Sequence, residues 1–258
     1  MSLAPGQPGS GIVFRRSDLA NQEIPAFYAK VAETRLGTVI NDGTVSVGVI
    51  EHLMAAVAGL AIDDLVVTLD GPEPPILDGD AQSYVALFDE AGSKETPGAR
   101  RALKIKKRVT AEAGDAYAVL SPAETLSFDF DIRFASPAIG TQFLSWTFST
   151  DGFRRDIAPA RTFGFVSELE ALNKMGLAKG ASLDNTLAIE GDKVVNQKLM
   201  RFPDEFVRHK ILDALGDMAL AGAPIIGKFE GHRSGHALNN QLLRAVFADK
   251  ANYEWVEA

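Results

Sequence analysis

Two residues of one periodic stretch have the types and spacing of metal ligands. His209 and Asp213 lie four positions apart within residues 204–221, which carry a helical pattern. On a helix this spacing places both side chains on one face, so an imidazole and a carboxylate could hold one ion together. Asp217 continues the same face one turn further along. The spacing alone also fits a solvated helix face with a charged pair, and both interpretations stay open.

A second candidate is the pair Glu51 and His52, which lies inside an otherwise apolar helical pattern at residues 47–60, with Ser46 as the expected N-cap. A charged pair in an apolar stretch costs free energy unless it is paired or bound to a metal. The pair also suits a metallohydrolase, in which the histidine binds the metal and the adjacent glutamate reaches the water bound to it. A hydrogen-bonded helical histidine beside an exposed glutamate is the alternative.

The third candidate is His236, in the segment GHRSGHALNN at residues 231–240. The glycines around it indicate a tight loop that could bring the imidazole close to a ligand. His236 could serve as a second acid/base group, or it could be an ordinary loop histidine before a helix. Nothing in the sequence assigns a role to His232.

Composition narrows the possible chemistry. The 258 residues include four histidines and no cysteine, which excludes disulfides and thiolate zinc sites. The net charge of −8 argues against broad nucleic-acid binding. No apolar run reaches the roughly 20 residues of a membrane span, and residues 1–10 lack the basic and apolar parts of a signal peptide. A soluble, cytoplasmic protein is the expectation.

The elements that must position these residues follow from periodicity and turn residues. We expect helices at 47–60, 83–91, 166–175, 204–221 and 234–247. We expect strands at 11–16, 65–69, 103–109, 117–120, 126–134, 143–148, 186–189 and 193–195. Residues 92–101 are rich in Gly, Pro, Ser and charge, which is typical of a linker. Strands followed by helices, twice over, predict an α+β fold.

Five blocks of the sequence together resemble the UDP-3-O-acyl-N-acetylglucosamine deacetylase family. These are VIEHLMAA at 49–56, PEPPILDGDA at 72–81, ARTFGF at 160–165, FVRHKILDALGD at 206–217 and SGHALNN at 234–240. The likeness runs in order from about residue 11 to the C-terminus. It implies two domains of similar topology, 1–98 and 99–258, with helices sandwiched between two outer sheets. It also implies an acyl-chain insert at about 166–196.

The resemblance assigns roles to single residues. His52, His209 and Asp213 match the metal ligands. Glu51 matches the catalytic base, His236 a second catalytic group, and Asp217 the residue that orients His236. Thr162 matches a hydroxyl near the reacting oxygen. The residues that match substrate contacts are Phe163, Phe165 and Lys210, and Leu169, Leu172 and Leu177 of the insert fit either an acyl passage or core packing.

The implied activity is hydrolysis of the N-acetyl group of UDP-3-O-acyl-N-acetylglucosamine, which gives the free amine and acetate in lipid A biosynthesis. One Zn²⁺ ion is the expected cofactor, although ferrous iron or cobalt also suits two imidazoles and a carboxylate. The expected partner is this small molecule, with no nucleic acid, no transmembrane segment and a monomeric chain.

Two features depart from the family pattern. The chain starts after the family's usual Gly-x-Gly-x-His-[ST]-Gly strand pair, and Gly180-Ala181-Ser182 stands where the insert usually has Gly-Gly-Ser. The missing pair predicts a less stable first domain. Alternatives to the deacetylase are a truncated or inactive paralogue that binds the UDP-lipid without turnover, and a zinc amidohydrolase for another acetylated sugar.

Overall fold

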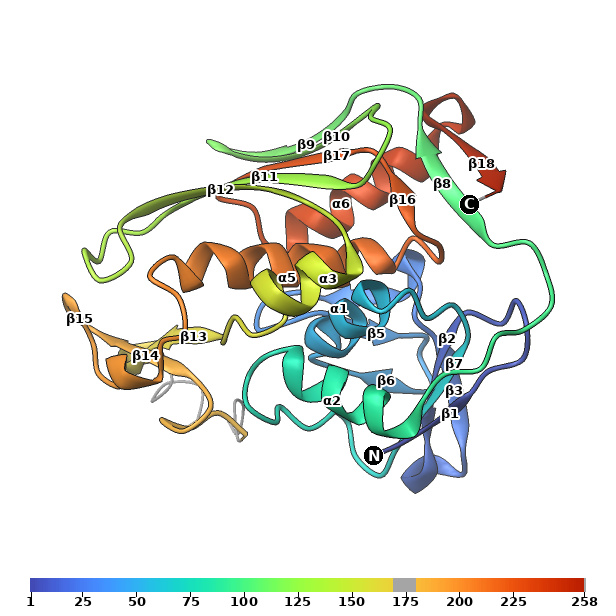
Figure 1. Ribbon diagram of the computed structural model, residues 1–258, viewed down its shortest axis with the longest axis horizontal. Helices are drawn as coiled ribbons and strands as arrows, with labels where there is room; N and C mark the ends of the chain where they lie inside the picture. Colours follow the sequence, from blue (N-terminus) through green and yellow to red (C-terminus); the bar gives the residue numbers. More distant parts are fainter. Residues whose placement is uncertain (169–179, 258) are drawn as a thin grey trace.

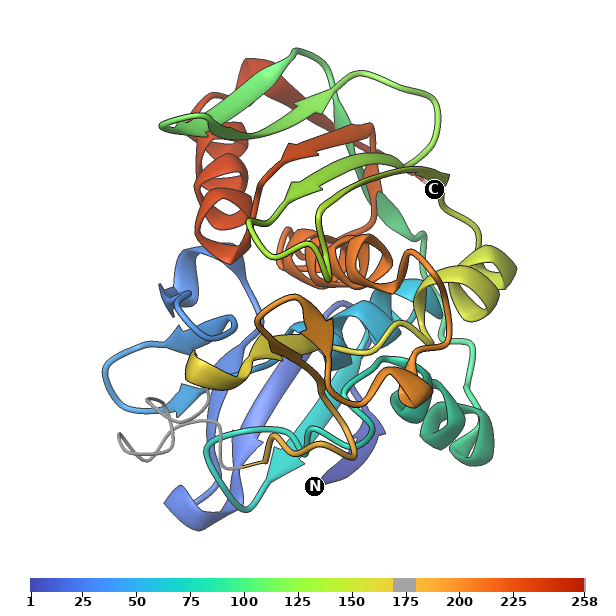
Figure 2. The same cartoon turned by 90° about the vertical axis from the view of Figure 1, so that its left-hand side faces the viewer.

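The protein has an α+β architecture in which helices lie between two outer sheets, as the computed structural model in Figure 1 shows for residues 1–168 and 180–257. In the view turned by 90°, α5 and α6 lie beneath the sheet of the C-terminal half, and α1 lies between α5 and the sheet of the N-terminal half (Figure 2). The expected layers are therefore confirmed. None of the helices in these two ranges has the length and apolar character to cross a membrane.

The N-terminal half contains two sheets and two helices. The first sheet has the order β1-β7-β2-β3, with β1 Ser2–Pro5, β7 Leu65–Leu69, β2 Ile12–Arg16 and β3 Gln22–Pro25. The second comprises β4 Val31–Glu33, β5 Val39–Asn41 and β6 Ser46–Val47. The helices are α1 Glu51–Gly59 and α2 Gln82–Ala91. Alternate residues of β7 are buried, so one face of the first sheet packs toward the helices.

The C-terminal half has a five-stranded sheet in the order β12-β11-β17-β10-β9. Its strands are β12 Thr141–Thr147, β11 Ser127–Arg133, β17 Lys228–His232, β10 Ala116–Ser121 and β9 Val109–Ala113. A smaller sheet joins β16 Ile225–Ile226, β8 Arg101–Ile105 and β18 Tyr253–Glu257. The long helices are α5 Glu205–Ala219 and α6 His236–Ala248.

The segment between β12 and α5 forms a third small sheet. It comprises β13 Phe163–Phe165, β14 Leu187–Glu190 and β15 Lys193–Val194. Before it, α3 Thr150–Gly152 continues into a π-helical turn at Phe153–Ile157. Short 3-10 turns occupy Ser17–Leu19, Tyr28–Lys30, Gln197–Leu199 and Lys250–Asn252. The expected helix at 166–175 is described only to residue 168, and Leu169, Leu172 and Leu177 lie outside the described residues.

The first helix begins later than its apolar pattern predicts. The sequence suggested a start near residue 47 with Ser46 as N-cap, but Ser46 pairs within β6 and α1 begins at Glu51. Val49 has a φ of 52°, which is left-handed backbone that a helix cannot contain. The N-cap prediction was wrong because β6 and the turn after it use the first apolar residues. Glu51 and His52 consequently occupy the first turn of α1.

Helices α1 and α5 are in backbone contact at the centre of the molecule. A Cβ added to Gly216 of α5 would lie 2.1 Å from the carbonyl oxygen of Glu51 and 3.1 Å from the amide nitrogen of Ala55, both in α1. Leu53 and Ala56 of α1 and Leu212 of α5 belong to one buried apolar cluster that spans both halves. The closeness of this contact sets how near the side chains of the two helices can approach each other.

The variant Gly216→Ala tests that contact. A methyl group at position 216 must push α1 and α5 apart, and overpacking of this kind typically costs about 1–3 kcal/mol. We expect a melting temperature lower by several degrees. The matched control is Gly71→Ala, because a Cβ at Gly71 meets no atom within 4 Å. Equal melting temperatures for the two variants would contradict the tight contact.

Candidate metal centre and acid/base pair

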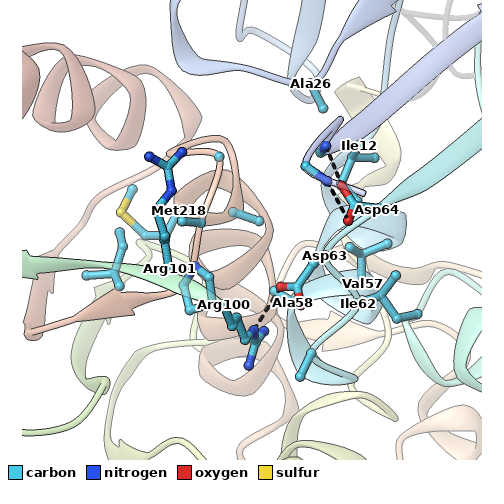
Figure 3. Close-up of a pocket in the computed structure, with 18 of the residues that line it drawn as sticks. Ile12, Ala26, Val57, Ala58, Ile62, Asp63, Asp64, Arg100, Arg101 and Met218 are labelled. Atoms are coloured by element: carbon cyan, nitrogen blue, oxygen red, sulfur yellow. Dashed lines mark hydrogen bonds and ion pairs between the residues drawn. The ribbon is translucent and has the colours of Figure 1, made fainter. Parts of the chain in front are cut away.

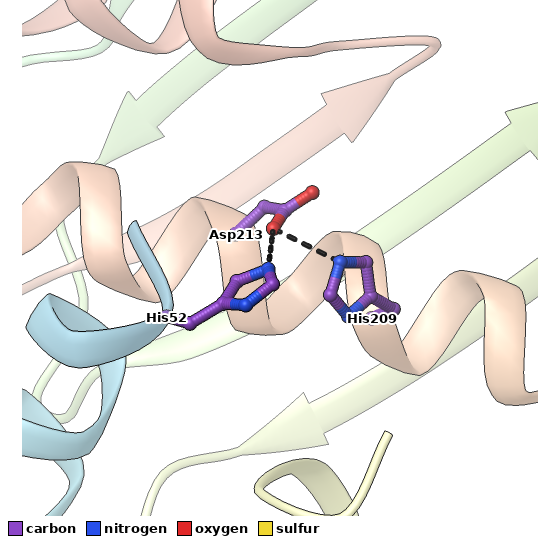
Figure 4. Close-up of side chains that lie close together, drawn as sticks. All are labelled: His52, His209 and Asp213. Atoms are coloured by element: carbon purple, nitrogen blue, oxygen red, sulfur yellow. Dashed lines mark ion pairs between the residues drawn. The ribbon is translucent and has the colours of Figure 1, made fainter. Parts of the chain in front are cut away.

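Three side chains that can bind a metal converge where α1 meets α5 (Figure 4). The Nε2 atom of His209 lies 3.3 Å from Oδ1 of Asp213, and Nε2 of His52 lies 3.8 Å from the same oxygen. The two imidazole rings are 4.9 Å apart at an angle of 84°. All three side chains are buried. His209 and Asp213, four residues apart in α5, thus lie beside His52 in the first turn of α1, so ligands from both halves meet at one point.

The donor set fits a divalent ion with an open coordination position. Ligands about 2.0–2.2 Å from a tetrahedral zinc ion lie roughly 3.3–3.6 Å apart, which is close to the distances from Asp213 to the two imidazoles. The second oxygen of Asp213, Oδ2, accepts a hydrogen bond of 2.8 Å from Nζ of Lys210, so Oδ1 faces the histidines. Two imidazoles and one carboxylate form the three-ligand pattern of catalytic metal sites.

The ionisation of these three groups also suits a metal. Burial lowers the pKa of His52 to about 3, and burial lowers the pKa of His209 in the same direction. For Asp213, burial alone would raise the pKa, but His209 and Lys210 together hold it well below its usual range. Neutral imidazoles and an ionised carboxylate are the forms that bind metal ions.

Glu51 and His236 face each other beside this cluster. Oε1 of Glu51 lies 3.8 Å from Nε2 of His236, and Nδ1 of His236 lies 2.8 Å from Oδ2 of Asp217. Asp217 also accepts a 2.8 Å hydrogen bond from the side-chain amide of Asn239, on the same helix as His236. The structure therefore brings together His236 and Asp217, the pair that the family resemblance implied, and Asn239 also binds Asp217.

The residue Thr38, which the sequence did not identify, joins both members of this pair. Its backbone N–H donates to Oε2 of Glu51 at 2.9 Å, and its hydroxyl donates to Oδ1 of Asp217 at 2.6 Å. Gly37 before it has a φ of 149°, and a Cβ there would lie 2.5 Å from Oε1 of Glu51. Only glycine allows this approach. The short loop that carries Thr38 has no periodicity that could have revealed it.

The pKa values of the pair are shifted in a complementary way. Burial raises the pKa of Glu51 to about 7, although the neighbouring charge of His236 acts in the opposite direction. Burial also tends to lower the pKa of His236, but Asp217 and Glu51 outweigh it and raise the value to about 10. Between these values Glu51 is ionised and His236 is protonated. One group can then accept a proton while the other donates one.

Among the remaining described candidates, Phe163 and Lys210 lie next to ligand residues, and Thr162 and Phe165 lie close to Phe163 in the chain. The ring of Phe163 lies 6.2 Å from that of His209 and 5.5 Å below Nζ of Lys210, and Phe165 packs 6.1 Å from Phe134. Thr162, next to Phe163, donates its N–H to the Gly79 carbonyl at 2.8 Å. Phe163, Phe165 and Thr162 are half-buried, so each keeps some exposed surface that a ligand can contact.

The fourth histidine, His232, has a structural partner. Its Nδ1 lies 2.8 Å from Asp131, and its ring stacks on Tyr117 at 5.1 Å. Both partners are strand residues of the five-stranded sheet. The contacts of His232 therefore differ from those of the other three histidines.

A separate cleft of about 870 Å³ lies between the two halves, and none of the candidate metal or acid/base residues lines it. It is formed by apolar side chains such as Met54 and Met218 and by charged residues near the linker (Figure 3). Arg100 pairs there with Asp63 at 2.8 Å. The reactive groups thus lie elsewhere than this cleft.

Comparison with known proteins shows the family of this chain. The profile of the UDP-3-O-acyl N-acetylglycosamine deacetylase family matches residues 1–248. A UDP-3-O-acyl-N-acetylglucosamine deacetylase of Myxococcus xanthus is 46% identical over 259 residues, which cover 100% of this chain and 82% of that protein. The enzyme of that name from Nitratiruptor sp. is 46% identical over 258 residues, covering 100% of this chain and 86% of the relative. One from Phenylobacterium zucineum is 46% identical over 251 residues, covering 96% and 86% respectively. On this evidence the chain belongs to the UDP-3-O-acyl-N-acetylglucosamine deacetylase family.

Proposed function

We propose that this protein is a metal-dependent deacetylase that hydrolyses the N-acetyl group of UDP-3-O-acyl-N-acetylglucosamine, giving the free amine and acetate in lipid A biosynthesis. The observation that carries the proposal is the convergence of two sets of groups in one buried place. His52, His209 and Asp213 form the possible metal site, and Glu51 and His236 face each other beside it. Membership of the family supplies the substrate.

We propose that His52, His209 and Asp213 hold one Zn²⁺ ion, and Fe²⁺ suits the same donor set. A bound ion of this kind lowers the pKa of a water ligand and polarises the acetyl carbonyl. Lys210 keeps Oδ2 of Asp213 occupied, which leaves Oδ1 for the ion. Residues around this metal site carry out the proton transfers.

Glu51 and His236 divide the proton transfers between them. The Glu51 carboxylate accepts a proton from the water whose oxygen adds to the acetyl carbon. Protonated His236 stabilises the negative charge on the former carbonyl oxygen and then donates its proton to the amine nitrogen as the C–N bond breaks. Asp217 keeps the His236 ring oriented and charged. We assign Thr162 as a further hydroxyl donor to the oxyanion.

For the substrate we propose contacts on the Phe163 side of the metal centre. Phe163 and Phe165 offer aromatic surface, and Lys210 is a cation for which phosphate is a suitable partner, although Asp213 already binds its ammonium group. We also propose Leu169 and Leu172 as substrate contacts, although both lie outside the described residues.

We also propose that the chain divides into domains at 1–98 and 99–258, with the acyl-chain insert at about 166–196, and that it acts as a cytoplasmic monomer.

The metal assignment predicts the effect of removing one ligand. His209→Ala should reduce the bound metal from about one equivalent to nearly none, because two remaining ligands hold a divalent ion poorly. Elemental analysis of the purified protein measures this directly. His232→Ala is the matched control, since His232 pairs with Asp131 outside the cluster. A full equivalent of metal in His209→Ala would rule the assignment out.

The activity is tested by acetate release from acylated and non-acylated UDP-N-acetylglucosamine. We expect hydrolysis of the acylated substrate in preference to the other. Glu51→Gln should keep its metal and lose at least ~100-fold in rate, which is the usual scale for a positioned base. No acetate release by the metal-loaded wild-type protein would contradict the proposed function. A Glu51→Gln rate close to wild type would remove Glu51 as the base.

The pH dependence tests His236 as the acid. Its pKa is raised to about 10, so the imidazole stays protonated at neutral pH and the rate should fall as pH rises through that value. The variant His236→Gln should be slower, and its kcat/KM should no longer show this fall at alkaline pH. His232→Gln should leave the profile unchanged. An alkaline limb that persists in His236→Gln would show that another group is the acid.

A further inference from the structure

The peptide group that joins Ala160 to Arg161 is held at both ends by helix α5. Its carbonyl oxygen, on Ala160, lies 3.0 Å from Nδ1 of His209. Its N–H, on Arg161, donates to Oε1 of Glu205 at 2.9 Å. The carbonyl and the N–H of a trans peptide point in opposite directions. Glu205 and His209 are four residues apart and share one face of α5. One helix face therefore fixes the orientation of this peptide plane.

The bond to the carbonyl decides which nitrogen of His209 carries the proton. A carbonyl oxygen can only accept, so Nδ1 must be the protonated nitrogen. Nε2 then carries the lone pair, and Nε2 is the atom 3.3 Å from Oδ1 of Asp213. Hydrogen bonds of this kind set the tautomer and the ring orientation of metal-binding histidines. A rotation of the peptide would break this hydrogen bond, and neither the tautomer nor the ring orientation of His209 would then be fixed.

Glu205 is itself held firmly. It is 0% exposed, and its second oxygen, Oε2, accepts the N–H of Phe202 at 3.1 Å and the N–H of Arg201. A buried carboxylate needs such partners because burial of an unpaired charge is strongly unfavourable. With Oε2 occupied by the turn before α5, Oε1 is free to face the Arg161 N–H.

The side chain of Arg161, next to the same peptide, is bonded to residues of both halves of the chain. Its Nη2 pairs with Oδ2 of Asp78 at 2.6 Å, its Nε donates to the Asp78 carbonyl at 3.0 Å, and its Nη1 donates to the Leu199 carbonyl at 2.7 Å. Arg161 is 5% exposed. Both ends of the peptide and the adjoining side chain are thus bonded, which leaves it little freedom to turn.

We propose that Glu205 is a positioning residue for the metal centre: through the Ala160–Arg161 peptide it keeps His209 protonated on Nδ1, with Nε2 directed at the metal site. The proposal rests on the proposed function, because it assumes that His209 is a ligand. Glu205 itself contacts neither the ion nor the substrate. Its effect passes through one backbone group.

The test compares Glu205→Ala and Glu205→Gln with Asp204→Asn. Asp204 is the neighbouring carboxylate at the same helix end, and it pairs with Arg208 at 2.6 Å. Nitrogen-15 NMR of the four histidine rings in metal-free protein reports the tautomer of His209, whose signals are assigned with His209→Ala. Competition with a chelator reports zinc affinity, and steady-state kinetics separates kcat from KM.

In wild type and Asp204→Asn, we expect His209 in the Nδ1-protonated form. Glu205→Ala should give a mixture of tautomers and a zinc affinity about 10–100-fold weaker, the usual cost of losing such support. At saturating zinc, kcat should fall with KM unchanged. Glu205→Gln should change the tautomer and the zinc affinity in the same direction but to a smaller extent, because its single amide oxygen can still accept the Arg161 N–H. It decides the question alone if Glu205→Ala does not fold.

An unchanged His209 tautomer and a zinc affinity within twofold of wild type in the folded variants would overturn the proposal. A lower melting temperature with both readouts unchanged would likewise reduce Glu205 to a structural residue and overturn it. If wild type binds no zinc, the metal assignment fails instead. The tautomer in metal-free protein still decides whether Glu205 acts on His209, so the two failures can be told apart.

Discussion

The contact between α1 and α5 is the constraint on which the site depends. Gly216 lets the backbone of α5 approach the first turn of α1 so closely that a Cβ would lie 2.1 Å from the Glu51 carbonyl oxygen. The first turn of α1 carries Glu51 and His52, and α5 carries His209, Asp213 and Asp217 on the facing side. The halves of the chain thus each supply part of one reactive centre. Their outer sheets hold the two helices together by burying one apolar cluster between them.

That arrangement places five ionisable side chains in a buried space, which is costly unless each has a partner. Hydrogen bonds supply such partners for the three carboxylates. Lys210 binds Asp213, while Thr38 binds both Glu51 and Asp217. Burial raises the pKa of Glu51, and the charges of Asp217 and Glu51 raise the pKa of His236 further still, against the effect of burial. The reactivity of the pair therefore depends both on the low polarity of the space between the helices and on the charges within it.

Much of the site could be predicted from the sequence because its residues lie within regular elements. The spacing of His209, Asp213 and Asp217 on one helix face follows from periodicity alone, and it holds in α5. Spacing did not predict that this helix face lies next to Glu51 and His52. That prediction came from resemblance to a family, because a contact between residues about 160 positions apart leaves no local pattern.

The features that the sequence missed depend on backbone groups and irregular segments. Thr38 acts through its N–H as well as its hydroxyl, and Glu205 acts through a peptide of another segment. Neither contact has a residue-type signature. The start of α1 was placed too early because β6 and the positive φ of Val49 interrupt an apolar run that otherwise reads as one helix. Short edge strands such as β4 and β16 were missed because two or three residues carry no period.

A crystal structure of the zinc-loaded protein, with anomalous diffraction recorded at the zinc edge, would locate the metal directly. We predict one strong anomalous peak about 2.0–2.2 Å from Nε2 of His52, Nε2 of His209 and Oδ1 of Asp213. Glu51 and His236 should lie beside the peak without binding it. A peak at any other position, or one bound by residues of only one of the two helices, would contradict the claim that α1 and α5 build a single metal centre between them.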